Sequence, residues 1–499
     1  MHISDSKEPY KKTYGAFNYR PLVLIAIGIG LGVLSIVLQR NVMIWACIIC
    51  CVMIALSVRF KNKVVFLIAF ATLFGMFRVA TMYPAEYELN GSNHIVKGRV
   101  YTTIDNSVVL DDVLIDGVCV EGKTLLKYVK TIPEIDDIVE CVARLEQTTE
   151  MTGKSYKYYM LSEDYLFVSS DLEYLNLIGH TDTLHGFFAE IHNYLADKID
   201  ELFGNQASTI KGILLGDSSE IPEDRMGNLR DSGIAHLLAL SGLHISIISS
   251  FIMFITKRMN KKVSFLVLCA VLSFYCAITA FPASLLRATI MTLLMMLSGL
   301  SGRRRDILSA CSLAFIVILI VNPYQLFAAG FALSFASVIG IILMYKPVRS
   351  MFSVVTEGSI TKPLSVSVSA TMGIMPMTAA YFHRMPYYAL ITNFIAIPAV
   401  SAAVVMAIIG LILGIIYTPL AVPLSAVVNY ILDGVLTMSA VVSKLPFAVI
   451  VTKSISILCG GLYYARMIAM SPYYITYPKN RLRISIVLTV LTFAAFILL

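Results

Sequence analysis

The side chains best suited to do chemistry lie between Thr209 and Ser250, where a polar segment is followed by an apolar one. Polar groups inside a bilayer have no water to bond, so each is costly and usually functional. The candidates for a path through the membrane in this stretch are Asp217, Arg230, Asp231, Gly233, His236, Ser241, Gly242 and His244. Ionised groups at a membrane entrance either steer or gate a charged substrate, or form ion pairs that fix a broken helix.

Three polar residues further along the chain interrupt apolar segments and are candidates to line the same path. Arg287 comes five residues after Pro282, and Asn393 and Asp433 lie in later apolar runs. A lipid-facing arginine at this depth costs several kcal/mol, so we expect Arg287 to face a wet cavity or to pair with Asp433 or Asp217. A cation in the wall of such a path suits a phosphate backbone.

Ser241 and His244 also allow a different class of function, an intramembrane serine hydrolase. A serine three residues from a histidine on one helix is poorly placed for general-base activation, and no second helix offers a well-matched histidine. His236 and His244 are eight residues apart, which is not the spacing of a helical metal site. A small-solute transporter would carry internal repeats, and none is evident. We therefore expect no enzyme activity, no cofactor and no metal.

Most of the chain must form the membrane wall that positions these residues. Of its 499 residues, 57% are hydrophobic and 14% are charged, which indicates a polytopic α-helical membrane protein. Apolar runs predict about 13 crossings, of which the short ones are candidates for re-entrant segments. The distribution of Lys and Arg places the N-terminus in the cytoplasm. The predicted parts are a basic arm with three helices (1–81), an extracytoplasmic β domain (82–172), an amphipathic interfacial helix (180–206), the main transmembrane domain (207–465, with a span at 446–465) and a basic cytoplasmic loop with a last helix (466–499).

The polar segment 82–172 contains five short runs of alternating polarity, which predict a small all-β barrel of OB type. The runs are His94–Tyr101, Val108–Ile115, Lys127–Thr131, Asp137–Leu145 and Tyr165–Ser169. OB barrels often bind single strands through basic grooves and stacking aromatic rings. From residue 94 to residue 170 there are 8 Lys and Arg against 13 Asp and Glu, a balance of 8 − 13 = −5, so any DNA-binding face must be local. The candidates for that face, which is otherwise a solvated or packed surface, are Lys123, Lys127, Lys130, Lys154, Tyr156, Lys157, Tyr158 and Tyr159.

Two further expectations concern the β domain and the helix that follows it. Cys119 and Cys141 are the only cysteines of the β domain and lie on separate predicted segments, so we expect a disulfide, with two buried free thiols as the alternative. The segment 180–206 carries apolar residues at helical spacing on one face. We expect this face to pack on the transmembrane domain rather than to sense lipid.

The order of motifs in this chain resembles the signature of the ComEC family of competence proteins. The matching residues are Leu214–Asp217, Arg230, Ser232–Gly233 and Ala235–His244, followed by Pro282, Arg287–Ala288, Asn322–Pro323, Gly330–Phe331, Leu333–Phe335, Pro376, Phe382, Asn393 and Pro398. The resemblance extends from about residue 20 to about residue 460.

The resemblance implies a channel in the inner (cytoplasmic) membrane that passes single-stranded DNA into the cell during natural transformation. It also implies an extracytoplasmic DNA receptor and a cytoplasmic helicase-like ATPase as partners, and it leaves open whether the pore forms in a monomer or a homodimer. The sequence contains no P-loop, so we expect the energy to come from elsewhere. It also contains no His-x-His-x-Asp-His cluster, so we expect a form without the metallo-β-lactamase-like domain of many members, and strand degradation by a separate nuclease.

Overall fold

The computed structural model divides the chain into two compact units, which are described separately. One unit comprises Met1–Phe74, Phe335–His383 and Thr452–Leu499, and the other comprises Gly75–Ser334 and Arg384–Val451. The structure describes residues 20–35, 40–82, 87, 89, 93–104, 106–151, 154–302, 306–353, 361–452, 457–471, 484 and 487–489. The predicted basic arm and most of the predicted last helix lie outside the described residues.

Helices of the first unit approach one another through small residues. Its elements are α1 (Pro21–Leu34), α2 (Arg40–Arg59), the greater part of α3 (Lys63–Met82) and of α12 (Ala329–Ser353), α13 (Thr361–Phe382) and α16 (Ile457–Met470). A Cβ added to Gly28 would lie 2.6 Å from the Cβ of Ala71, and one added to Gly340 would lie 2.6 Å from the Cα of Gly373. Only glycine permits such close approach of two helix backbones.

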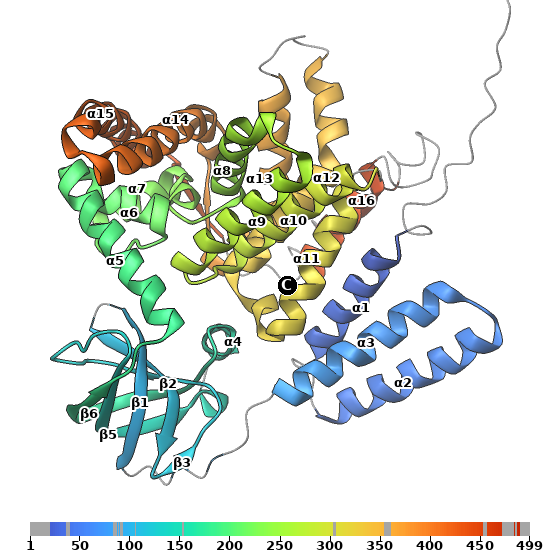
Figure 1. Cartoon of the computed structure of the whole chain (residues 1–499). Coiled ribbons are helices and arrows are strands. Elements are labelled where there is room, and N and C mark those ends of the chain that lie inside the picture. The colour runs from blue at the N-terminus through green and yellow to red at the C-terminus, as the bar shows by residue number, and fades with distance from the viewer. Residues whose placement is uncertain are drawn as a thin grey trace, which may run out of the picture. The chain divides into compact units, whose positions relative to one another are not determined.

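The second unit contains the remaining helices and a two-stranded sheet. Its elements are α4 (Lys154–Ser162), α5 (Leu184–Phe203), α6 (Ala207–Leu215), α7 (Glu223–Ser232), α8 (Gly242–Ile255), α9 (Lys261–Ile278), α10 (Ala283–Leu300), α11 (Ile307–Val321), η6 (Pro323–Phe327), α14 (Ala389–Ile416), α15 (Thr418–Ser443), β7 (Arg384–Pro386) and β8 (Val449–Val451). Long helices α14 and α15 lie side by side (Figure 1). The apolar face of α5 contributes Ile199, Leu202 and Phe203 to the core formed with α6, α14 and α15. This is the packing role expected for the amphipathic segment.

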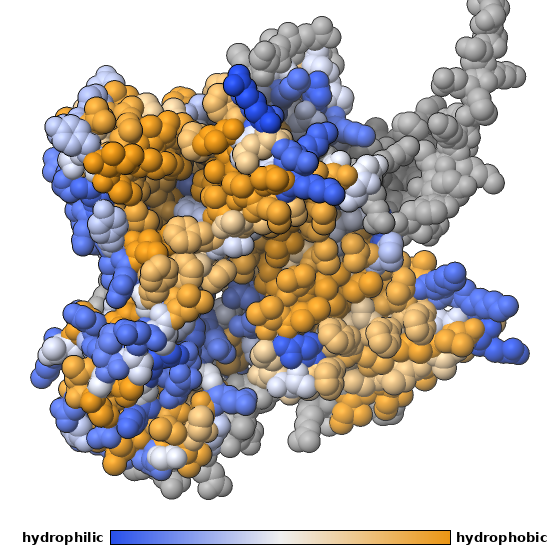
Figure 2. All heavy atoms as spheres, in the orientation of Figure 1, coloured by the Kyte–Doolittle hydropathy of each residue, from blue (hydrophilic) through white to orange (hydrophobic). Residues whose placement is uncertain are grey.

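Seven helical segments in the described part of the chain are long and apolar enough to cross a membrane. They are Lys63–Met82, Ala235–Arg258, Lys261–Ile278, Ala283–Leu300, Ala329–Ser353, Ala389–Ile416 and Thr418–Ser443. Apolar side chains cover the visible faces of α9, α10 and α11 (Figure 2). The continuous span predicted at 446–465 is wrong, because residues 449–451 form the strand β8; the described helix after it is α16 (Ile457–Met470). A short apolar run does not by itself distinguish a strand from a buried helix, and here pairing with β7 decides it.

A small closed β-sheet precedes α5. Its strands are β1 (Asn93–Ile104), β2 (Ser107–Ile115), β3 (Val118–Cys119), β4 (Lys123–Leu126), β5 (Asp137–Gln147) and β6 (Tyr165–His180). They pair in the order β1-β5-β6-β4-β2-β3, and β1 also pairs with β2, so the sheet closes into a barrel. The β4–β6 pair is parallel, whereas the other pairs are antiparallel. These observations confirm a mostly helical fold with a small β barrel.

Two strand predictions need correction. The strand expected at Lys127–Thr131 is wrong, because β4 occupies Lys123–Leu126 and the chain then turns at Tyr128, where φ is +60°. Strand β6 continues to His180, beyond the expected end of the domain at residue 172. Its second half pairs with β5 from Val142↔Tyr174 to Asp137↔His180, which is backbone pairing that a count of alternating residues does not detect.

The predicted disulfide between Cys119 and Cys141 is also wrong, since both thiols are free. Cys119 is exposed on β3, which among the described strands pairs with β2 alone. Cys141 is fully buried inside the barrel on β5, where burial and, to a lesser extent, Glu140 raise the pKa of its thiol to about 12. A thiol with such a high pKa is protonated and unreactive at neutral pH.

Candidate functional site

The signature segment forms a broken helical path rather than one continuous apolar helix. Gly216 caps the C-terminus of α6 and Gly233 that of α7, both with left-handed backbone (φ +85° and +81°). A Cβ on Gly216 would lie 2.7 Å from the Cδ1 of Leu240, and one on Gly233 would lie 2.5 Å from the Cβ of Ala389. Both positions therefore require glycine for two reasons, conformation and close approach. After Gly233 the chain passes through a 3₁₀ turn, Ala235–Leu237, into α8.

Helix α7 is held against the start of α14. The Thr392 hydroxyl donates to the carbonyl oxygen of Ser232 over 2.7 Å, and Arg384 pairs with Asp231 over 3.0 Å. Arg230 pairs with Glu223 of its own helix over 2.8 Å. The side chains of both arginines are more than half exposed. The geometry thus contains the ion pairs expected of a braced helix break, at positions that a charged solute can still reach.

Asp217 and Lys211 anchor the loop between α6 and α7. Asp217 accepts hydrogen bonds from the backbone N–H (3.0 Å) and hydroxyl (2.6 Å) of Ser219. The buried ammonium of Lys211 lies 2.8 Å from a carboxylate oxygen of Asp200 on α5 and 2.8 Å from one of Glu220 in the loop. Sequence reasoning missed this lysine, although a lone charge within the apolar helix α6 was a signal for it.

Ser241 caps α8 together with His244. The Ser241 Oγ accepts from the backbone N–H of Leu243 over 3.3 Å, and the Nδ1 of His244 accepts from the backbone N–H of Ser241 over 3.1 Å. The neutral imidazole that accepts at Nδ1 carries its proton on Nε2. Among the described residues, the buried Nε2 of His244 has no hydrogen-bond partner. His236 instead contacts the carbonyl oxygen of Gly233 (3.2 Å) and is exposed, so the two histidines do not form one site.

Arg287 lies beside this break. Its side chain is 7% exposed, and its Nη2 is 3.9 Å from where a Cβ on Gly242 would lie. The Ser284 hydroxyl donates to the carbonyl oxygen of Leu240 over 2.6 Å, which ties the first turn of α10 to the break before α8. The structure therefore brings together the chain breaks before α8 and α10 and the positive charge of Arg287.

Two candidates for pairing with Arg287 and one further polar candidate lie elsewhere. Asp433 on α15 accepts from the side-chain amide of Gln206, and the carboxylate of Asp217 is bonded to Ser219. Both carboxylates therefore have hydrogen-bond donors other than Arg287, and pairing of either aspartate with Arg287 stays a prediction. Asn393 on α14 is 7% exposed, and its Oδ1 has no hydrogen-bond partner in the described part of the chain.

The residues predicted as a DNA-binding face of the barrel fall into two groups. Tyr158 stacks on Phe327 of η6 at 4.5 Å between ring centroids, and the Lys157 ammonium donates to the carbonyl oxygen of Thr149 over 2.6 Å. Burial also lowers the pKa of Lys157. The ammonium of Lys123 lies 3.4 Å from the centroid of the Tyr101 ring. These side chains have partners within the protein.

The second group is open to solvent. Lys127 donates to the hydroxyl of Tyr156 over 3.2 Å, Tyr156 and Tyr159 are 41% and 49% exposed, and Lys130 is exposed. The side chain of Lys154 lies outside the described residues. The accessible part of the predicted face therefore lies around the turn after β4 and one side of α4.

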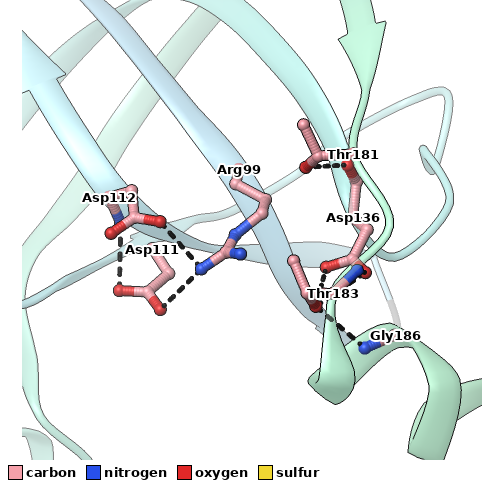
Figure 3. A network of polar contacts seen from close by, with 7 residues as sticks. All are labelled: Arg99, Asp111, Asp112, Asp136, Thr181, Thr183 and Gly186. Carbon is pink, nitrogen blue, oxygen red and sulfur yellow. Dashed lines mark hydrogen bonds and ion pairs between the residues drawn. The ribbon is translucent and has the colours of Figure 1, made fainter.

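The junction between the barrel and α5 was not predicted. Both carboxylate oxygens of the buried Asp136 accept hydrogen bonds from Thr183, and the Thr183 hydroxyl accepts from the backbone N–H of Gly186 over 3.1 Å (Figure 3). A Cβ on Gly186 would overlap this carboxylate. Nearby, Arg99 pairs with Asp111 and Asp112. The barrel is thus fixed to the first turn of α5 through one buried aspartate.

The fold and the site together define a mostly helical membrane protein that carries an inserted β barrel and a broken helix rich in polar groups. The model of a protein family described as "Competence protein" matches residues 213–474 of the chain. This match covers more than half of the 499 residues, and the chain belongs to the competence protein family. The resemblance to ComEC proteins noted from the signature residues is confirmed.

Three curated relatives match parts of the chain. ComE operon protein 3 of Bacillus subtilis (strain 168) is 30% identical over 199 residues, which are 39% of this chain and 25% of that protein. The uncharacterized protein YcaI of Escherichia coli (strain K12) is 26% identical over 40% of this chain and 28% of its own length. An uncharacterized protein of Aquifex aeolicus (strain VF5) is 27% identical over 40% of this chain and 48% of its own length. The chain spans less than half of each of these relatives, and no solved structure matches it significantly.

Proposed function

We propose that this protein is a channel through which single-stranded DNA crosses the cytoplasmic membrane during natural transformation. The observation that carries the proposal is the buried Arg287 beside Gly242, at a break in the family's signature segment. A fixed cation next to a helix N-terminus stabilises a passing phosphate, because the helix dipole and the guanidinium act in the same sense. The match to the competence family supports DNA as that anion.

The barrel extends this proposal to the outer side of the membrane. Its strand order and its parallel β4–β6 pair support an OB-type barrel, a fold that often binds single strands. The proposed partners are single-stranded DNA, the lipid bilayer, an extracytoplasmic DNA receptor and a cytoplasmic helicase-like ATPase, with a separate nuclease and a second copy of this chain as further partners.

The outward location of the barrel is tested by labelling. An impermeant thiol reagent should label a cysteine placed at Ser107 in intact, wall-stripped cells that carry a cysteine-depleted variant. Labelling only after lysis contradicts an outward barrel.

The channel is tested by transformation frequency at matched membrane abundance, in a transformable strain that lacks its own family member. Arg287→Ala should reduce transformation sharply, and Arg287→Lys should restore it only in part, because an ammonium lacks the planar fork of the guanidinium. Arg349→Ala, an exposed arginine on α12, is the matched control and should transform normally. Equal transformation by the Arg287 and Arg349 variants contradicts the proposal.

Ser241 separates this function from an intramembrane hydrolase. As a helix cap, Ser241→Ala should cost about 1 kcal/mol of stability and leave uptake measurable. A hydrolase predicts the opposite order: loss of activity in Ser241→Ala, and labelling of the wild type alone by a serine-reactive fluorophosphonate. The 3.4 Å between Ser241 Oγ and His244 Nδ1, with that nitrogen already accepting from a backbone N–H, favours the cap.

A further inference from the structure

Tyr128 combines two unusual properties. Its side chain is 78% exposed, and its backbone is left-handed with φ +60°. A bulky residue in this region of backbone conformation is strained, and such strain persists only where the surroundings impose it. Because the tyrosine ring is exposed, burial of the ring contributes little stability to the barrel and does not offset this backbone strain.

The surroundings that impose this conformation are two hydrogen bonds on either side of Tyr128. The backbone N–H of Lys127 donates to the hydroxyl of Ser169 on β6 over 2.9 Å. The backbone N–H of Val129 donates to the carbonyl oxygen of Asn106, in the turn between β1 and β2, over 2.8 Å. The ring of Tyr128 is therefore presented on a fixed turn and not on a loose loop.

The position of this turn in the barrel matches the ligand-binding face of OB folds. In those folds the second and third strands, with the loop after the first strand and the loop before the fifth, hold oligonucleotides. Tyr128 follows β4, which is the third barrel strand in chain order when the two-residue β3 is set aside, and its turn bonds to the loop after β1. Lys127 reaches Tyr156 on α4, which lies in the segment between β5 and β6.

The chemistry around Tyr128 suits a polyanion with flat bases. Tyr156 and Tyr159, three residues apart on α4, lie on the exposed side of that helix, whereas Tyr158 stacks on Phe327. Lys127 and the exposed Lys130 flank Tyr128 and supply positive charge within an otherwise acidic domain. Exposed rings interleaved with lysines are the pattern by which proteins hold single strands without reading sequence.

We infer that Tyr128, with Tyr156, Tyr159 and the two lysines, is a stacking platform for the bases of a single-stranded nucleic acid at this end of the barrel. This inference rests on the proposed function, and it adds a specific binding site to it. Removing one tyrosine ring on which a base stacks should weaken binding of the oligonucleotide about 5- to 150-fold.

The test measures equilibrium binding of fluorescein-labelled oligothymidylate to the full-length protein in lipid nanodiscs, by anisotropy. Tyr128→Asn removes the ring and keeps a residue that tolerates left-handed backbone, so it should fold as well as the wild type. It should bind the oligonucleotide at least 5-fold more weakly, whereas Tyr128→Phe should keep the wild-type affinity. Tyr174→Ala, on β6, is the control for loss of an exposed tyrosine (43%) and should bind normally. Lys127→Gln should lower the slope of log affinity against log salt by about 0.7.

Three outcomes overturn the platform: equal affinity of Tyr128→Asn and wild type, equal loss in Tyr174→Ala, or no binding by the wild type beyond that of empty nanodiscs. Reduced association of Tyr128→Asn with protein-free vesicles, at unchanged oligonucleotide affinity, also overturns it and assigns the ring to lipid. The platform and the channel can fail separately. If Arg287→Ala abolishes transformation while the wild type binds no oligonucleotide, the platform is wrong and the channel stands.

Discussion

At the junction between the barrel and α5, both oxygens of the buried Asp136 carboxylate accept hydrogen bonds from Thr183. On α8 and α14, by contrast, the buried Nε2 of His244 and Oδ1 of Asn393 have no hydrogen-bond partner among the described residues. An unsatisfied buried polar group costs about 1–3 kcal/mol. The comparison teaches that polar groups at the junction stabilise the fold, whereas those on α8 and α14 cost stability, as expected of groups kept for function rather than for folding.

The largest loss of stability is expected at Gly186, where the junction between the barrel and α5 has no space for a side chain. Gly186→Ala places a methyl group on the Asp136 carboxylate, so the first turn of α5 must shift and its hydrogen bonds are lost. We expect a loss of about 3 kcal/mol or more in stability, seen as a lower midpoint of thermal unfolding of the purified protein. Gly179→Ala on β6, where an added Cβ meets no atom within 4 Å, is the matched control. Similar midpoints for the two variants would show that the junction is not rigid.

Removing the carboxylate itself should cost somewhat less. Asp136→Ala leaves the half-buried backbone N–H and hydroxyl of Thr183 without their acceptor, which we expect to destabilise the protein by about 2 kcal/mol. Hydrogen exchange should rise in the first turn of α5 and stay unchanged in α14. Faster exchange spread evenly over both helices would contradict a local role for Asp136.

On α14, substitution of the buried Asn393 is expected to leave stability unchanged or to raise it. Asn393→Leu replaces a buried amide whose oxygen has no partner in the described part of the chain, so stability should stay within about 1 kcal/mol or rise, while transformation falls. Its neighbour Thr392→Val breaks the bond to the carbonyl oxygen of Ser232 and should lower stability by about 1 kcal/mol. If Asn393→Leu destabilises the protein as much as Thr392→Val does, Asn393 belongs with the structural groups.

The smallest effect is a pH dependence at the edge of the junction. The hydrogen bond from His180 to Asp137 (2.8 Å) raises the pKa of His180, and the charges of Asp137, Asp182 and Asp136 add to this. Because the pKa is higher in the folded state, the contribution is fully present below the unfolded pKa, near 6.5, and is lost as pH rises through the folded value. The midpoint of thermal unfolding should therefore decline slightly between about pH 6 and pH 8, and His180→Gln should flatten this decline. If the unfolding midpoint of His180→Gln depends on pH as steeply as that of the wild type, His180 does not contribute to the stability of the junction.

Much of the fold could be predicted from hydrophobic pattern alone. Alternating residues located four of the barrel strands, including Val108–Ile115, which coincides with most of β2. The third strand was misplaced because β4 is only four residues long. The alternating pattern continues in the sequence beyond β4, although the backbone turns at Tyr128. The span at 446–465 failed for a similar reason, since Val449–Val451 owes its strand conformation to pairing with β7, more than sixty residues earlier.

The candidate site was predicted in part. Ser241, His244 and Arg287 were identified from the cost of polar groups in apolar runs, and all three lie at one chain break: Ser241 and His244 cap α8, and Arg287 lies beside Gly242. The partners could not be predicted, because ion pairs such as Arg384–Asp231 join residues 153 positions apart. Asp136 was overlooked because an aspartate in a polar loop is ordinary in sequence and becomes significant only when Gly186 is brought against it.

The bond between Asp136 and Thr183 also has a consequence for the order of assembly. Asp136 precedes β5 and reaches its place only when β5 and β6 have paired as far as Asp137↔His180. Thr183 begins α5 immediately after that strand. The acceptor that fixes the first turn of α5 therefore exists only once the barrel is complete, and β6, its last strand, precedes α14 and α15 by more than two hundred residues. The barrel can fold while the ribosome is still synthesising the helices on which α5 will pack, and it then determines where that helix begins.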